Sequence, residues 1–284
     1  MKQLPRVILY GRLEVEKFQA LAEGCKAVGW HPMLQRPSQF RSVDAYPDAL
    51  AVVVDGLGPE GRPIAETYRR LGVPVWVLEL PRIRQYSGEH ALLLDSLHWL
   101  PEGVAGRIMP EFTKIDRKAG AKHILLAMQK PKDAAHGMDL DALERWARNT
   151  VAFIKAVTGK QVIVRPHPKH TSAMPDDLFG ADALSHPNTE PIDAALAKAA
   201  AVVSYNSTVG WDAIIAGVPV VALAPAALCS YHRYTTTLAE LKPLPAKART
   251  EALARVASTQ WTLDELRDGT ALMATVAVSH LLAT

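Results

Sequence analysis

Residues 201–223 read AVVSYNSTVGWDAIIAGVPVVAL, and this stretch shows how the chain folds. It opens with a short apolar run at 201–204 and closes with another at 218–223. Both runs are typical of strands that are buried on both faces. Apolar residues between the runs recur at helical spacing, and the turn before them carries residue types that favour N-caps: Asn206, Ser207 and Thr208. The stretch therefore predicts a strand, a helix and a second strand.

The polar turn in this stretch is a candidate anion site. Hydroxyl side chains at the start of a helix, beside the carboxyl end of a strand, suit a phosphate group. In an open α/β sheet, ligands bind beside the carboxyl ends of the strands. We therefore expect Asn206, Ser207 and Thr208 to hold a phosphate. Asp212, one turn further along, either accepts a hydrogen bond from a ribose hydroxyl or is an ordinary helix aspartate.

The same alternation of strands and helices extends over both halves of the chain. Apolar runs such as 6–10, 49–54 and 124–128 are followed by helical patterns. This order predicts an α/β protein with two Rossmann-like domains that face a cleft. We place the domains at 1–113 and 114–284, and expect that the last helix could pack back onto the first domain.

Composition narrows the class of protein. The chain has 284 residues, of which 49% are hydrophobic, enough for one large or two modest domains. A net charge of +3 is too small to imply nucleic-acid binding, although it does not exclude it. Cys25 and Cys229 lie far apart without metal-ligand spacing, which favours a reduced, cytoplasmic protein. No stretch approaches the ~20 apolar residues of a membrane span, so we expect no transmembrane segment.

A second motif, Arg165-Pro166-His167-Pro168-Lys169, follows the predicted strand at 161–164. Its prolines restrict the backbone around one imidazole, which can donate to a phosphate oxygen. Arg165 and Lys169 add positive charge for an anion. The alternative is a turn with a solvated basic cluster. Two further residues end the preceding predicted strand and could reach the same ligand: Gln129 and Lys130.

RPHPK followed by YNSTVGWDAIIAGVPVV resembles the GT-B glycosyltransferases that use CMP-activated sugars. These are the bacterial capsule Kdo transferases and, more distantly, bacterial sialyltransferases. The resemblance covers about 162–223 and implies a donor-binding role for His167, Ser207 and Thr208. It implies a GT-B-like fold, with the acceptor on the first domain and a CMP-, UDP- or GDP-linked sugar on the second. It also implies transfer to a hydroxyl acceptor, by default a saccharide, without a metal or other cofactor.

An inverting transfer needs a base that takes the proton of the acceptor hydroxyl. The related sialyltransferases use an acidic pair followed by glycine, and Val54-Asp55-Gly56 matches this in part. Asp55 ends a predicted strand and is our candidate catalytic base, beside His167 on the donor side. A turn aspartate is the alternative, and a retaining transfer would need no such base. Three other residues are held in reserve: Glu14, Glu79 and His90.

Three alternative functions stay open. Residues 56–61 match G-x-G-x-x-G, with Glu79 at the end of the next predicted strand, as in nicotinamide-dependent oxidoreductases. Against this, Pro59 removes one N–H from the phosphate cradle, and the match follows a later strand than is usual. The acceptor could instead be a hydroxymethylated pyrimidine base in DNA, as for phage-type DNA glycosyltransferases. Finally, the chain could be a non-catalytic nucleotide-binding protein.

No metal site is expected. Asp139-Leu140-Asp141 is a D-x-D sequence, but it opens a predicted helix, where capping explains it better. His167 and His170 have no third ligand at convincing spacing.

Overall fold

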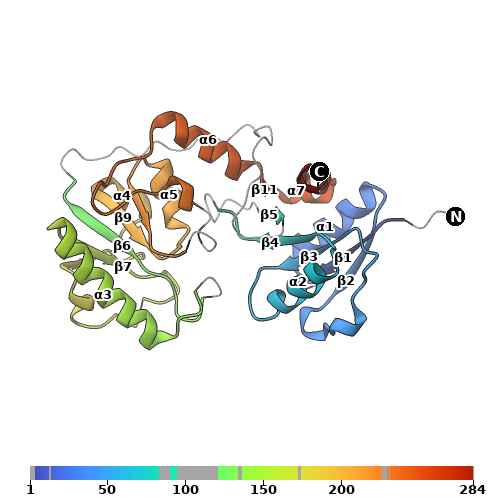
Figure 1. Cartoon of the computed structure of the whole chain (residues 1–284), viewed down its shortest axis with the longest axis horizontal. Helices are drawn as coiled ribbons and strands as arrows, with labels where there is room; N and C mark the ends of the chain where they lie inside the picture. Colours follow the sequence, from blue (N-terminus) through green and yellow to red (C-terminus); the bar gives the residue numbers. More distant parts are fainter. Residues whose placement is uncertain are drawn as a thin grey trace. The chain divides into compact units, whose positions relative to one another are not determined.

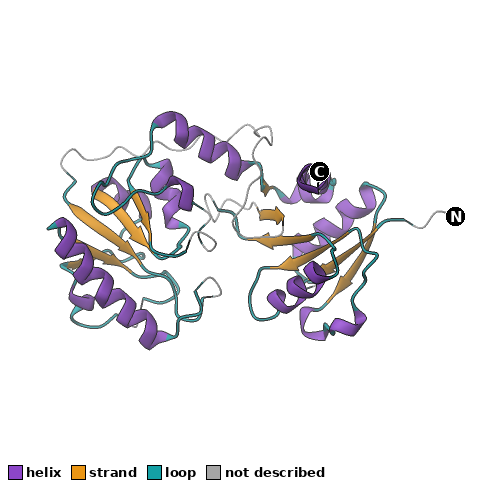
Figure 2. Cartoon of the chain, in the orientation of Figure 1, coloured by secondary structure: helices purple, strands orange, loops and turns teal. Residues whose placement is uncertain are grey.

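A computed structural model of the chain describes residues 4–12, 14–82, 90–94, 121–133, 136–171, 174–225, 229 and 231–283. It divides the chain into two compact units. Unit 1 consists of Met1–Ile108 and Ala254–Thr284, and unit 2 of Met109–Leu253. Each unit is built on its own β-sheet with helices against it (Figure 2). No helix in the described part of the chain is long and apolar enough to cross a bilayer.

Sheet A, in unit 1, has the strand order β11-β5-β4-β3-β1-β2 (Figure 1). β1 pairs in parallel with β2 and β3, and β3 pairs in parallel with β4, whereas β5 and β11 are antiparallel additions at one side. The strands are β1 (Arg6–Tyr10), β2 (His31–Gln35), β3 (Ala51–Asp55), β4 (Val75–Glu79), β5 (His90–Leu94) and β11 (Gln260–Trp261).

Helices cover both faces of sheet A, because successive side chains of a strand point to opposite faces. On one face, Val7 and Leu9 pack with Phe18 of α1. On the other, Ile8 packs with Ile64 of α2. The helices of unit 1 are α1 (Glu16–Ala27), α2 (Gly61–Arg70), α7 (Leu263–Arg267) and α8 (Thr270–Ala283), with 3₁₀ turns at Pro37–Gln39 and Ser42–Asp44.

The carboxy-terminal segment, Ala254–Thr284, belongs to unit 1, whereas the sequence placed 114–284 in a second domain and expected only that the last helix could pack back onto the first. Leu266 and Leu272 lie in the same core as Phe18, and β11 pairs with β5. These apolar residues cover α1. The division between the two units falls within α6 (Ala246–Ala257). The other expected boundary, between 113 and 114, lies outside the described residues.

Sheet B, in unit 2, has the order β10-β9-β6-β7-β8, and all of its pairings are parallel (Figure 1). The strand, helix and strand predicted at 201–223 are present as β9, α5 and β10. The strands are β6 (His123–Ala127), β7 (Val162–Arg165), β8 (Ala183–Leu184), β9 (Ala199–Ser204) and β10 (Val220–Ala222). The helices are α3 (Leu140–Thr158), α4 (Ile192–Lys198) and α5 (Val209–Ile215), with 3₁₀ turns at Leu178–Gly180 and His232–Tyr234. Two parallel-sheet units confirm the predicted α/β class.

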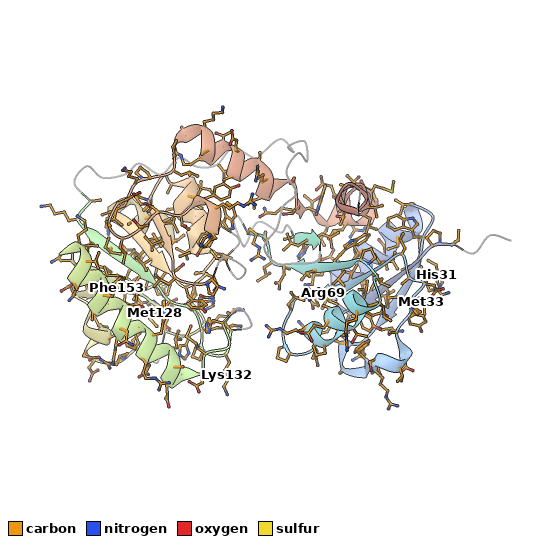
Figure 3. The ribbon with its side chains drawn as sticks, in the orientation of Figure 1. His31, Met33, Arg69, Met128, Lys132 and Phe153 are labelled. Carbon is orange, nitrogen blue, oxygen red and sulfur yellow. The ribbon has the colours of Figure 1, made fainter. Side chains whose placement is uncertain are left out.

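Helix α3 begins and ends as the sequence predicts. The Asp139 side chain accepts a hydrogen bond of 2.8 Å from the backbone N–H of Ala142, so the D-x-D sequence includes an N-cap. Gly159, at φ 62°, closes the helix. The apolar face of α3 covers sheet B near the buried Met128, whereas Phe153 on α3 is 55% exposed (Figure 3).

Candidate functional site

The predicted donor residues of unit 2 meet at the carboxyl edge of sheet B. Ala127 of β6 lies opposite Arg165 of β7 and Ser204 of β9 in the strand register. Neighbouring strands are about 4.8 Å apart, so the residues that follow these positions lie close together. The residues concerned are Gln129 and Lys130 after β6, His167 and Lys169 after β7, and Asn206, Ser207 and Thr208 after β9.

Gln129 connects two of these strand ends. Its side chain is buried, and its Oε1 accepts a hydrogen bond of 3.2 Å from the backbone N–H of Asn206. The amide oxygen is thereby used within the protein. Gln129 therefore holds the turn after β9 in place, rather than offering that oxygen to a ligand.

His167 presents one particular nitrogen. The backbone N–H of Lys169 donates to His167 Nδ1 over 3.1 Å, so in the neutral ring the proton is on Nε2. Burial lowers the pKa of His167 below its ordinary value; Asp133 opposes this effect, and Lys130 and Lys169 reinforce it. The ring is therefore neutral at physiological pH and offers Nε2–H as a hydrogen-bond donor.

The turn after β9 offers hydroxyl groups. Ser207 Oγ accepts a long bond of 3.4 Å from the Val209 N–H, and the Thr208 side chain makes no capping bond to α5. Helix α5 has only seven residues, so its dipole is short. The hydroxyls, more than the helix, give this turn its capacity for an anion. Asp212 lies on α5, one turn further along, and is partly buried.

Aromatic rings hold the turn from both sides, which the sequence analysis did not predict. Tyr205 lies edge-on to His136 and Trp146, with centroids 5.9 and 6.1 Å apart. Tyr231 is fully buried, and its hydroxyl lies 2.7 Å from Ser204 Oγ. These contacts fix the end of β9 and the residues that follow it. Rings separated by many residues in the chain leave no local pattern from which this packing could be predicted.

Arg165, predicted to contact the donor, makes side-chain hydrogen bonds within the protein. Its side chain is buried, and Nη1 donates to Ser185 Oγ over 2.7 Å while Nη2 donates to the Glu190 carbonyl over 2.9 Å. Burial lowers the pKa of Arg165, and Glu190 opposes this effect. The guanidinium joins β7 to the segment after β8. Arg165 is the last residue of β7, whereas His167 lies in the turn that follows the strand.

The predicted base in unit 1, Asp55, ends β3 and is paired with a lysine. Lys17 Nζ lies 2.5 Å from Asp55 Oδ1, and the two side chains are only 14% and 23% exposed. Lys17 was not predicted. It stands in the first turn of α1, where the helix dipole disfavours a cation, and this placement is the signal that could have identified it.

Two of the reserve candidates gather around Asp55. A Cβ placed on Gly56 would lie 2.8 Å from Glu79 Oε1, so this carboxyl packs against the turn after β3. Burial raises the pKa of Glu79, against the effects of Arg82 and Lys17. Burial lowers the pKa of His90, and His90 Nδ1 is buried without a partner among the described residues.

The fourth candidate lies apart from this group. Glu14 is exposed and lies 3.9 Å from Arg36, at the limit of an ion pair.

The glycines of the G-x-G-x-x-G match have a packing explanation. Gly56 has φ +72°, and any side chain on Gly61 would overlap the Gly56 carbonyl oxygen. Around Gly58 there is open space. The glycines thus allow a tight connection between β3 and α2.

The His-Pro turn is not specific by itself. His31-Pro32 lies at the amino end of β2, away from the carboxyl edge (Figure 3). His186-Pro187, after β8, repeats the turn of His167, because His186 Nδ1 accepts the Asn188 N–H over 3.2 Å. Of these three His-Pro sequences, only His167-Pro168 follows β7. This strand pairs with β6, which also pairs with β9, the strand that precedes the hydroxyl-bearing turn. Within the described residues, no group of three His, Cys, Asp or Glu side chains is arranged to hold a metal ion.

Arg165→Met tests the structural role of this arginine. We expect a loss of about 2–4 kcal/mol in the free energy of unfolding, because Ser185 and Glu190 lose buried hydrogen bonds. Urea denaturation measures it. Lys169→Met, at an exposed position, is the control and should stay within about 0.5 kcal/mol. Equal small effects of both substitutions would contradict the structural role.

Comparison with known proteins agrees with this architecture. Neither a family model nor a curated protein sequence matches the chain. Among solved structures, the KpsC β-Kdo 2,4 transferase of Thermosulfurimonas dismutans is similar over 89% of this chain and 91% of its own, with TM-score 0.54 and 14% identity. The β-Kdo 2,7 transferase from the same organism is similar over 97% and 99%, with TM-score 0.53 and 14% identity. At this identity the likeness concerns the fold: the chain has the GT-B fold, as the resemblance implied.

Proposed function

We propose that this protein is a glycosyltransferase that moves a sugar from a nucleotide-activated donor to a hydroxyl acceptor. The observation that carries the proposal is that His167, with its Nε2–H, and the hydroxyl residues Ser207 and Thr208 follow the carboxyl ends of β7 and β9, the two strands that flank β6. The fold shared with two Kdo transferases supports sugar transfer. Donors linked to CMP, UDP or GDP all carry the phosphate that this edge suits.

On the donor side, unit 2 stabilises the leaving phosphate. As the bond between the anomeric carbon and the phosphate oxygen breaks, its electron pair stays on the phosphate. The Nε2–H of His167 and the hydroxyls of Ser207 and Thr208 donate to this developing charge. Lys130 and Lys169 add positive charge. Together, these donors and cations stabilise the negative charge on the phosphate, which a metal ion stabilises in other transferases. We therefore propose transfer without a metal.

On the acceptor side, unit 1 supplies the base. Asp55 takes the proton of the acceptor hydroxyl as the oxygen forms its bond to the anomeric carbon, with inversion. Lys17 holds the Asp55 carboxylate in one orientation through their ion pair. Glu79 packs against the turn that directly follows Asp55.

A cytoplasmic location is part of the proposal, and the cysteines support it. Cys25 and Cys229 are both buried, and neither forms a disulfide within the described residues. Burial raises the pKa of the Cys25 thiol to about 12, so this group stays protonated and unreactive.

Nucleotide binding tests the donor half. We expect one of CMP, UDP or GDP to raise the melting temperature, since a ligand at a hundred times its Kd adds about 2.7 kcal/mol to the free energy of unfolding. His167→Ala should remove most of this increase. The matched control is His186→Ala, which changes a histidine in the same kind of turn and should keep the increase. The donor site is wrong if no nucleotide stabilises the wild type, or if both variants respond equally.

Lys17→Met tests the base. The measurement is the pH profile of nucleotide release from the donor that binds. Loss of the ammonium group leaves the Asp55 carboxylate without the partner that orients it, so the rate across the profile should fall about tenfold or more. Lys17→Arg should restore much of the profile.

Lys26→Met, in the last turn of α1, is the control for Lys17→Met. If Lys17→Met keeps the pH profile of the wild type and has a rate like that of Lys26→Met, Asp55 is not the base.

A further inference from the structure

A cavity in unit 1 has no role in the steps above. It has a volume of about 410 Å³, within the range of small-molecule sites. It lies at the carboxyl ends of β1 and β2 and in the segment that follows β2. Its lining includes Tyr10, Gln35, Arg36, Phe40, Arg41 and Tyr46.

This cavity, the β1–β2 pocket, opens at the same edge of sheet A as Asp55. In the strand register, Tyr10 lies opposite Gln35 on one side and opposite Val54 on the other. Asp55 comes directly after Val54, so the pocket begins about one strand spacing, roughly 5 Å, from the proposed base. β2 lies on one side of β1, and β3 and the strands after it lie on the other. The strand order therefore reverses at β1, and α/β sheets bind ligands at such a reversal.

The aromatic wall of the pocket is rigid. Tyr10 and Phe40 meet edge to face, with ring centroids 5.4 Å apart. The Tyr68 hydroxyl lies 3.2 Å from that of Tyr10 and accepts the Tyr46 N–H over 3.3 Å. Gln35 Nε2 in turn donates to the Tyr46 hydroxyl over 3.4 Å. Tyr10 and Tyr68 are buried and hold the wall in place, whereas Phe40 and Tyr46 are partly exposed and suit contact with the C–H face of a sugar.

The polar wall of the pocket is positively charged. Arg36 and Arg41 are exposed, and Asp44 is the acidic residue of the lining. Arg36 has only the 3.9 Å approach to Glu14, and Arg41 makes no ion pair within the described residues. Two guanidinium groups against one carboxylate leave a place for an anion, and guanidinium binds carboxylate or phosphate through two parallel hydrogen bonds.

We propose that the β1–β2 pocket binds the acceptor, and that the acceptor is a saccharide with a carboxylate or phosphate group. The inference rests on the proposed transfer function, whose acceptor it specifies. The aromatic wall contacts the sugar ring, Arg36 and Arg41 bind the anionic group, and the nearby edge presents a hydroxyl to Asp55.

A glycan array tests the pocket. The array carries carboxylated and phosphorylated saccharides, each beside its neutral counterpart, and the full chain is applied. We expect binding to acidic glycans only, and the preferred acid distinguishes carboxylate from phosphate. The double variant Arg36→Gln/Arg41→Gln should bind at least tenfold more weakly, while Arg145→Gln, an exposed arginine on α3, should bind like the wild type. Equal binding of neutral glycans, unchanged binding by the double variant, or no binding by the wild type would overturn the inference.

Nucleotide-induced stabilisation separates this inference from the proposed function. Both arginines are exposed, so the double variant should fold and should keep the stabilisation by nucleotide. A wild type that responds to nucleotide but has no preference for acidic glycans contradicts the acceptor inference alone. A wild type that binds acidic glycans through these arginines without any response to nucleotide supports the pocket and contradicts the transfer function.

Discussion

The candidate donor site depends on one constraint, the parallel pairing of β6 with β7 and β9. Parallel strands all end at one edge, so segments distant in the sequence place His167 and Ser207 at the same edge of sheet B, on either side of β6. The bond from the Asn206 N–H to Gln129 Oε1 then fixes the turn after β9 to the end of β6. Everything proposed for the donor follows from this edge, because neither the His-Pro turn nor the short helix α5 is distinctive by itself.

Parallel strands also bring the candidate residues of unit 1 to one edge, but there the residues are carboxyl groups and a lysine. There the carboxyl edge of sheet A carries Asp55, its partner Lys17 and the buried carboxyl of Glu79. A proton acceptor needs a defined orientation, and an ion pair with little exposure provides it. Unit 2 instead carries neutral and cationic donors. One edge thus suits removal of a proton, and the other suits a departing phosphate.

Much of the fold follows from local patterns, and the rest depends on distant partners. The segment β9-α5-β10 was predictable because apolar runs, N-cap residues and a closing glycine stand together in 201–223. β11 was not, because two residues near 260 form a strand only by pairing with β5, far back in the chain. Among the candidate site residues, His167 and Asp55 could be selected from the sequence because each lies in a short motif that follows a predicted strand. The internal hydrogen bonds of Arg165 could not be predicted because sequence does not show which way its side chain points, and Lys17 was missed because its partner lies on another element.

The central claim is that His167 donates its Nε2–H to the phosphate of a nucleotide. Imidazole nitrogen NMR of the ¹⁵N-histidine-labelled chain, titrated with CMP, UDP and GDP at neutral pH, tests this most directly. His167→Gln assigns the resonances, and His186 serves as an internal control. The account predicts that His167 Nδ1 is unprotonated throughout and that its Nε2–H signal moves on saturation with one nucleotide, while His186 stays unchanged. A His167 signal that is unaffected by all three nucleotides, or that carries its proton on Nδ1, would contradict it.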